Sequence, residues 1–129
     1  MEKEFFRVPQ KAMIKNSEKF LVVKRQPNAH TYPNHWDFPG GKHDPGETAE
    51  EAVKREVYEE TGFIIVPGEV IKELVYKDKH HDIHFYIFSI KSYSGDFALS
   101  EDHSESLWVS KEEIKNLGLH PSVSLFSNG

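Results

Sequence analysis

Short runs of apolar, β-branched and aromatic residues alternate along the chain with segments rich in glycine, proline and charge. Runs of about four to eight such residues favour extended strands, in which neighbouring side chains point to opposite faces. The pattern predicts strands at residues 5–8, 11–15, 20–25, 36–38, 69–76 and 83–93. Residues 26–34 contain two prolines and two asparagines, which predicts a loop.

The last two predicted strands lie close enough in sequence to pair as a hairpin across residues 77–82. The later strand carries apolar side chains on both of its faces: Phe85, Tyr86, Ile87 and Phe88. A strand that is apolar on both faces is typical of a central position that is covered on each side.

The segment from Gly40 to Phe63 changes from glycine- and proline-rich to a helical pattern. Thr48 with Glu51 three residues later forms a capping box, which marks a helix start. Gly62 is typical of the residue just past a helix end. These signals predict a helix over Ala49–Thr61. Its apolar stripe toward the core is Ala49, Ala52, Val53 and Val57.

A second capping box, Ser110 with Glu113, predicts a late helix that starts at Ser110. Strands mixed with helices in this order predict an α/β (α+β) domain, in which helices pack on a mixed β-sheet. The length of 129 residues suits one domain with one core, so we expect residues 1–129 to form a single domain.

Composition narrows the function classes. The chain has no cysteine, which excludes disulfides, thiol catalysis and thiolate metal sites. No apolar run approaches the ~20 residues of a membrane span, and no signal-peptide core follows Met1 to Glu4. We therefore expect a cytoplasmic protein that does not bind membranes. The net charge of -5 argues against a nucleic acid polymer as partner.

Three glutamates share one side of the predicted helix: Glu56, Glu59 and Glu60 stand at i, i+3 and i+4. Like charges at this spacing destabilise a helix, and carboxylates near its C-terminus oppose the helix dipole. One interpretation is a solvated face on which Arg55 pairs with Glu59. The other is a magnesium site, because Mg²⁺ prefers carboxylates together with substrate phosphates.

The spacing of the whole segment resembles a known family signature. Gly41 is followed after five residues by Glu47, and after seven more by the run from Arg55 to Phe63. Every defined position of Gly-x5-Glu-x7-Arg-Glu-U-x-Glu-Glu-x-Gly-U is present, where U is a bulky apolar residue. This is similar to the complete Nudix box of MutT-like hydrolases, and residues 36–41 resemble the usual lead-in.

The resemblance implies a Nudix-type α/β/α sandwich that hydrolyses a diphosphate bond in a nucleoside diphosphate derivative, with Mg²⁺ or Mn²⁺ as cofactor. In this family water attacks phosphorus. The metal ligands that the resemblance implies are Glu56, Glu59, Glu60 and the backbone carbonyl of Gly40. The implied catalytic residues are Glu47, Arg55, Glu56 and Glu59. Arg55 and Glu47 would form an ion pair that orients Glu56, while the glutamate that takes the water's proton differs within the family.

Other candidate residues lie outside the box. A further acid in the family comes from a loop before a late strand, which here offers Asp102, Glu101 and Glu105. Many relatives have Glu-His where this chain has Asp102-His103, so the sequence does not decide which of these acids is the further metal ligand. The alternative is a solvated acidic loop.

Substrate contacts are expected from Arg25, which suits phosphates, and from Trp36 and Phe38, which could stack a base. A surface ion pair and a place in the core are the alternatives for these residues. His80, His81 and His84 resemble a metal cluster, but a solvated turn is the alternative for them.

The substrate prediction depends on family markers that are absent. In the family, a proline downstream of the box marks hydrolases of ADP-ribose, and this chain has Lys79 at that place. A tyrosine near the same distance marks hydrolases of dinucleoside polyphosphates, and this chain has His80 and His81 there. We therefore expect a nucleoside triphosphate, including an oxidised one such as 8-oxo-dGTP, to be cut to monophosphate and pyrophosphate. The alternatives are ADP-ribose or a nucleotide sugar, and a non-catalytic nucleotide-sensing module, which the intact charged set disfavours. Relatives are often dimers, so a homodimer is left open.

Overall fold

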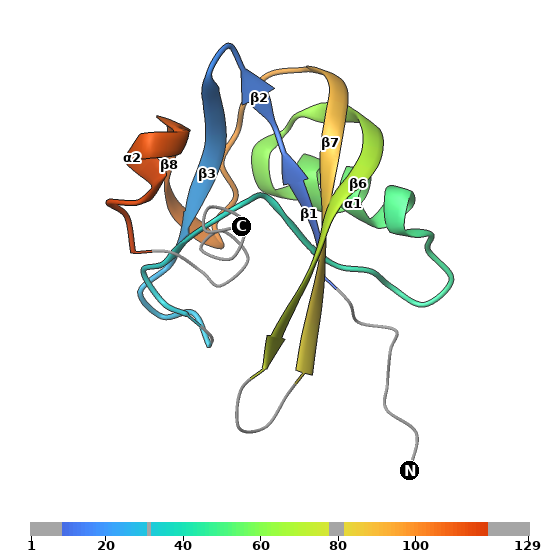
Figure 1. Ribbon diagram of the computed structural model, residues 1–129, viewed down its shortest axis with the longest axis horizontal. Coiled ribbons are helices and arrows are strands. Elements are labelled where there is room, and N and C mark those ends of the chain that lie inside the picture. The colour runs from blue at the N-terminus through green and yellow to red at the C-terminus, as the bar shows by residue number, and fades with distance from the viewer. Residues whose placement is uncertain (1–8, 31, 78–81, 119–129) are drawn as a thin grey trace.

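The computed structural model describes residues 9–30, 32–77 and 82–118. The predicted strand at residues 5–8 and the turn residues His80 and His81 lie outside this part. Figure 1 shows the elements in space. In chain order they are β1 (Pro9–Met13), β2 (Lys15–Asn16), β3 (Lys19–Arg25), β4 (Trp36–Asp37), β5 (Gly40–Lys42), α1 (Ala49–Thr61), β6 (Ile64–Lys77), β7 (Asp82–Ser94), β8 (His103–Ser110) and α2 (Lys111–Ile114).

The first sheet is mixed, as predicted, with the strand order β5-β1-β7-β6. Strand β1 runs parallel to β7, while the β1–β5 and β6–β7 pairs are antiparallel. The predicted hairpin is present, since Lys77 on β6 pairs with Asp82 on β7. Strand β7 is central, and its Phe85, Ile87 and Phe88 are buried, which confirms the prediction from its two apolar faces.

The second sheet consists of β2, β3, β4 and β8, and β3 pairs with each of the other three in antiparallel fashion. The predicted strand at 11–15 is therefore wrong in extent: β1 ends at Met13, and Lys15 begins β2 in the other sheet. After β4 the chain passes through Phe38 and Pro39 into β5 of the first sheet, so both sheets meet beside this crossing.

Strand β5 was not predicted, because its glycines indicated a loop. Gly40 has φ +137, and a Cβ on it would overlap the carbonyl oxygen of Gln10 on β1. Glycine inside a strand often marks such a close approach of two backbones. The glycine thus allows β5 to pair with β1 and brings the start of the box against the first sheet.

Helix α1 has the predicted bounds and caps. Thr48 and Glu51 form the capping box, and Gly62 ends the helix with φ 76 and with its N–H donating to the carbonyl of Tyr58. Ala52, Val53 and Val57 are buried as predicted, and each buried valine stabilises the fold by roughly 1.5–3 kcal/mol.

The prediction for the first position of the apolar stripe was wrong, because Ala49 lies exposed in the first turn of α1. In the last turn, the pattern did not predict that Glu60 is buried.

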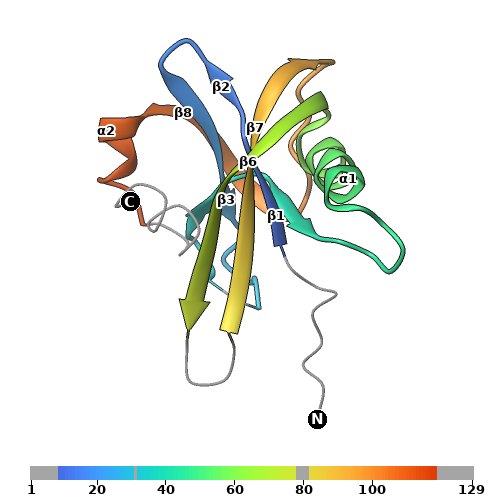
Figure 2. The same cartoon turned by 45° about the vertical axis from the view of Figure 1, so that its right-hand side comes forward.

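Two clusters form the core. In one, Val53 and Val57 of α1 pack with Ala12 and Phe88 of the first sheet. In the other, apolar side chains from both sheets pack with Ile114 of α2. The two helices therefore lie on opposite sides of the sheets, as Figure 2 shows. This confirms the α/β/α arrangement, and the predicted cap at Ser110 is also present. Within the described residues, no helix is long and apolar enough to cross a membrane.

Candidate active site

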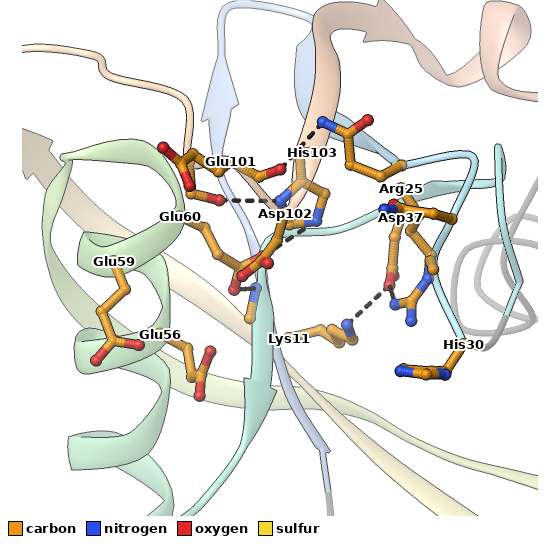
Figure 3. A pocket seen from close by; sticks show the side chains of 15 residues that line it. Lys11, Arg25, His30, Asp37, Glu56, Glu59, Glu60, Glu101, Asp102 and His103 are labelled. Carbon is orange, nitrogen blue, oxygen red and sulfur yellow. Dashed lines mark hydrogen bonds and ion pairs between the residues drawn. The ribbon is translucent and has the colours of Figure 1, made fainter.

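A cavity of about 570 Å³ opens where the C-terminal half of α1, the start of β5 and the turn before β8 meet. Figure 3 shows its side chains from close by. On one side stand acids from α1 and the turn: Glu56, Glu59, Glu60, Glu101 and Asp102. Lys11, Arg25 and Asp37 form the opposite side. The rest of the lining is Gln26, Asn28, Ala29, His30, Gly40, Ser100 and His103.

Gly41 leaves room for the side chain of Glu56, which lines this cavity. A Cβ on Gly41 would lie 2.6 Å from Oε2 of Glu56 and 2.7 Å from its Cδ. Any larger residue would therefore move the Glu56 carboxylate. This gives a physical reason for glycine at the first position of the signature.

Arg55 joins the loop before α1 to the helix. Its Nε donates to Glu47 Oε2 at 2.6 Å and its Nη2 to Glu47 Oε1 at 2.9 Å, a bidentate pair. The hydrogen bonds from Arg55 and from the backbone N–H of Asp44 lower the pKa of Glu47 from 4.5 to about 2. Nη1 of Arg55 also donates to Glu56 at 3.0 Å and to Glu59 at 3.2 Å.

Among the acids of α1 that line the cavity, Glu60 is the most enclosed, and its side chain is 9% exposed. The backbone N–H of Gly40 donates to its Oε2 at 3.1 Å. Burial raises the pKa of Glu60 well above its ordinary value, although the nearby Lys11 charge acts against this shift. Burial also raises the pKa of Glu56, and Arg55 opposes that effect. Two neighbouring carboxylates are thus both costly to ionise in this state.

The opposite side of the cavity contains a buried ion pair that the sequence did not reveal. Nζ of Lys11 on β1 lies 2.9 Å from Oδ2 of Asp37 on β4, so the pair joins the two sheets. Nη1 of Arg25 lies 3.5 Å from the same oxygen. Arg25, predicted to contact phosphates, therefore lines the cavity beside a second basic group.

The turn before β8 separates the three predicted candidates for a further acid. Glu101 and Asp102 line the cavity, whereas Glu105 does not and pairs with Lys24 at 3.2 Å on the exposed surface. Glu105 was predicted as a candidate for this acid, but it lies on β8 beyond the turn and does not line the cavity. The structure adds His103, which was not predicted: burial lowers the pKa of its imidazole, and its Nε2 lies 3.4 Å from Glu60 Oε1.

The predicted stacking residues are in the core. Trp36 is 7% exposed, Phe38 is fully buried, and both pack in the cluster beside α2 rather than lining the cavity. The alternative interpretation, core packing, is correct for both. Of the predicted histidine cluster, His80 and His81 lie outside the described residues, and the side chain of His84 is not described.

The lining suits a hard divalent cation by charge and by donor type. It carries six carboxylates against two basic side chains, and oxygen ligands are those that Mg²⁺ prefers. Within the described part of the chain, no three acidic, histidine or cysteine side chains are arranged to hold a metal ion. Arg55 holds the carboxylates of Glu56 and Glu59 by hydrogen bonds. A cation would compete for them and would offset the charge of buried Glu60.

Comparison with known proteins identifies the family of this chain. The family model of the NUDIX domain matches residues 7–126. The chain belongs to the Nudix family. As a Nudix pyrophosphohydrolase it hydrolyses diphosphate bonds of nucleotide-type small molecules, and enzymes of this family generally use divalent metals.

Its relatives include proteins described as nucleoside triphosphatase NudI. The one from Klebsiella pneumoniae is 28% identical over 122 residues, which cover 86% of each chain. The one from Salmonella agona is 29% identical and covers 79% of this chain and 80% of the relative. Among solved structures, the MutT protein of Methanosarcina mazei has a TM-score of 0.82 and 33% identity to this chain. The matched region covers 95% of this chain and 88% of the M. mazei chain. The E. coli ORF135 protein has a TM-score of 0.79 and 26% identity, with 92% and 84% covered.

Proposed function

We propose that this Nudix hydrolase cleaves a nucleoside triphosphate to a monophosphate and pyrophosphate with Mg²⁺ or Mn²⁺. The observation that carries the proposal is the division of one cavity into an acidic side on α1 and an opposite side with two basic groups, Lys11 and Arg25, that share Asp37. A chain of phosphates needs both: cations at the acids, and direct basic contacts for the oxygens that the cations leave free. The similarity to nucleoside triphosphatases at 28–29% identity supports the substrate class.

The excess of acids makes a metal necessary for binding. Six carboxylates and two basic groups line the cavity, so a polyphosphate would meet a negative surface there. The residues that would hold the metal are Glu56, Glu59, Glu60 and the carbonyl of Gly40, with Asp102 or Glu101 as a further acid. When bound, the metal supplies neutralisation of phosphate charge and a lower pKa for bound water.

The chain's own groups then have separate tasks. Arg25 and Lys11 bind phosphate oxygens and orient the substrate. Arg55, held by Glu47, keeps the Glu56 side chain at the cavity. A carboxylate of the acidic side, Glu56 or Glu59, accepts the proton from the attacking water, which requires hydrogen-bond reach to it. The cytoplasmic location and the homodimer remain predictions.

The test is product analysis on a nucleotide panel with Mg²⁺, with Mn²⁺ and with EDTA. The panel contains nucleoside triphosphates, 8-oxo-dGTP, ADP-ribose, nucleotide sugars and dinucleoside polyphosphates. We expect metal-dependent turnover of a triphosphate above all other classes, and its loss in Glu56→Gln. The matched control is Glu50→Gln on the exposed first turn of the same helix, which should retain activity.

Three outcomes would contradict the proposal. Preference for ADP-ribose or a nucleotide sugar would overturn the substrate assignment. Full activity of Glu56→Gln would overturn the site. A folded chain that binds nucleotides and hydrolyses none would instead favour a sensing module.

A further inference from the structure

The turn that precedes β8 is attached to the C-terminal end of α1. The backbone N–H of Ala98 donates to the carbonyl of Thr61 at 2.8 Å, and that of Ser100 donates to the carbonyl of Glu60 at 2.9 Å. Carbonyls in the last turn of a helix have no partner within the helix, so these bonds satisfy groups that would otherwise need water. The turn is thus held at a fixed place beside the acidic side of the cavity.

From this turn, His103 reaches the carboxylate of Glu60. Its Nε2 lies 3.4 Å from Glu60 Oε1, and each of the two side chains is 9% exposed. The other ring nitrogen, Nδ1, lies 3.3 Å from the hydroxyl oxygen of Ser100. The second carboxylate oxygen of Glu60 accepts from the backbone of Gly40 at 3.1 Å. Figure 3 shows the side chains of Glu60 and His103 directed toward each other.

We propose that His103 is a positioning residue for Glu60: its Nε2–H donates to the carboxylate, and the Ser100 hydroxyl donates to Nδ1 and so fixes this tautomer. The proposal rests on the proposed function, in which Glu60 holds the metal. The Gly40 and His103 contacts fix both oxygens of one carboxylate from two different segments of the chain. Glu60 then keeps one orientation for the metal, and the two contacts that set it come from outside helix α1.

The expected effect is on metal affinity. Partners that orient a metal ligand typically contribute about 10–100-fold to metal affinity or activity. Loss of the donor lets the Glu60 side chain rotate toward other partners. A role in packing alone would change stability and leave the affinity for metal unaltered. Glutamine can place an N–H donor near the position of Nε2, whereas phenylalanine fills the space without any donor.

The experiment measures Mn²⁺ binding directly, by the electron paramagnetic resonance signal of free Mn²⁺, with no substrate present. The variants are His103→Phe, His103→Gln and Ser100→Ala, and circular dichroism verifies folding of each. The control is His35→Gln, a half-buried histidine outside the cavity lining. We expect about 10–100-fold weaker binding for His103→Phe, a smaller loss for Ser100→Ala, near-normal binding for His103→Gln, and no change for the control.

Two results overturn the proposal. One is wild-type Mn²⁺ affinity in folded His103→Phe. If that variant does not fold, wild-type affinity in Ser100→Ala together with a full loss in His103→Gln has the same meaning. Hydrolysis of the nucleotide panel by the wild-type chain is assayed in parallel. A wild type that hydrolyses and binds Mn²⁺, with variants that bind equally well, refutes only the positioning role. A wild type that neither binds Mn²⁺ nor hydrolyses any nucleotide refutes the proposed function as well.

Discussion

Replacement of Gly41 by alanine should separate the fold of this enzyme from its activity. The added Cβ would lie 2.6 Å from Oε2 and 3.2 Å from Cγ of Glu56. The atoms it meets belong to the far end of a flexible side chain, so the backbone can stay in place. The carboxylate, however, has to leave the position in which Arg55 now holds it at 3.0 Å.

The magnitudes follow from these distances. The optimal separation of non-bonded heavy atoms begins at about 3.5 Å. The carboxylate oxygen, which would lie 2.6 Å from the new Cβ, must therefore move away by about 0.9 Å. A side chain forced off its rotamer costs about 0.5–1.5 kcal/mol, which in a domain of this size lowers Tm by about 2–8 °C. A misplacement of about 1 Å in a catalytic group can reduce activity roughly 100-fold. We therefore expect a folded protein with about 1% of the wild-type kcat/KM.

The assay combines thermal unfolding with the rate of nucleotide hydrolysis in Mg²⁺. The control is Gly118→Ala, because a Cβ there meets nothing within 4 Å, and it should retain both Tm and activity. Wild-type activity in Gly41→Ala would refute the reasoning, since Glu56 would not need its present position. A protein that fails to fold would refute it in another way, because the clash would then involve more than one side chain.

Three further predictions follow from the charges of the site. Burial raises the pKa of Glu60, so its contribution to stability is lost as pH rises through the folded pKa. In EDTA, the Tm of wild type should therefore fall relative to that of Glu60→Gln as pH rises, and Glu60→Gln should be inactive; a difference in Tm that does not change with pH contradicts this. The pKa of Glu47 is lowered to about 2, so its stabilisation exists above the ordinary 4.5 and is lost as pH falls toward 2. The gap in Tm between wild type and Glu47→Gln should narrow over that range, and a constant gap argues against the ion pair. Arg25→Ala should raise KM about 10–100-fold, the equivalent of one charged hydrogen bond; an unaltered KM removes Arg25 from the phosphate contacts.

Local signals account for the parts of the fold that the sequence predicted. The capping box at Thr48 and the glycine at position 62 act within a few residues of their own positions, and α1 has the bounds they indicate. The apolar faces of β7 likewise reflect its own surroundings. Strand β5 was missed because the reason for its glycine lies in β1, where the carbonyl of Gln10 approaches Gly40. Sequence alone does not show that approach.

In the candidate site, too, the sequence predicted residues that lie close together in the chain and missed a pair that comes from distant segments. The spacing of the signature places Glu56, Glu59 and Glu60 on one helix, and all three line the cavity. The groups that face them come from distant segments: Lys11 and Asp37 are 26 positions apart and meet only because the two sheets do. The available signal for that pair was a lysine directly before the apolar run Ala12, Met13 and Ile14.

The aromatic residues show a second limit of sequence reasoning. Trp36 and Phe38 stand close to the site in sequence, but their side chains point into the core. An aromatic residue near a loop end is compatible with base stacking and with core packing alike. Only the position of the second sheet and of α2 decides between the two.

The most direct test of the central claim is ³¹P nuclear magnetic resonance of a nucleoside triphosphate incubated with the full chain and Mg²⁺. We expect that signals of pyrophosphate and nucleoside monophosphate grow together, that EDTA stops their growth, and that Glu56→Gln does not produce them. Release of inorganic phosphate as the first product, or turnover that continues in EDTA, would contradict the metal-dependent cleavage proposed for this cavity.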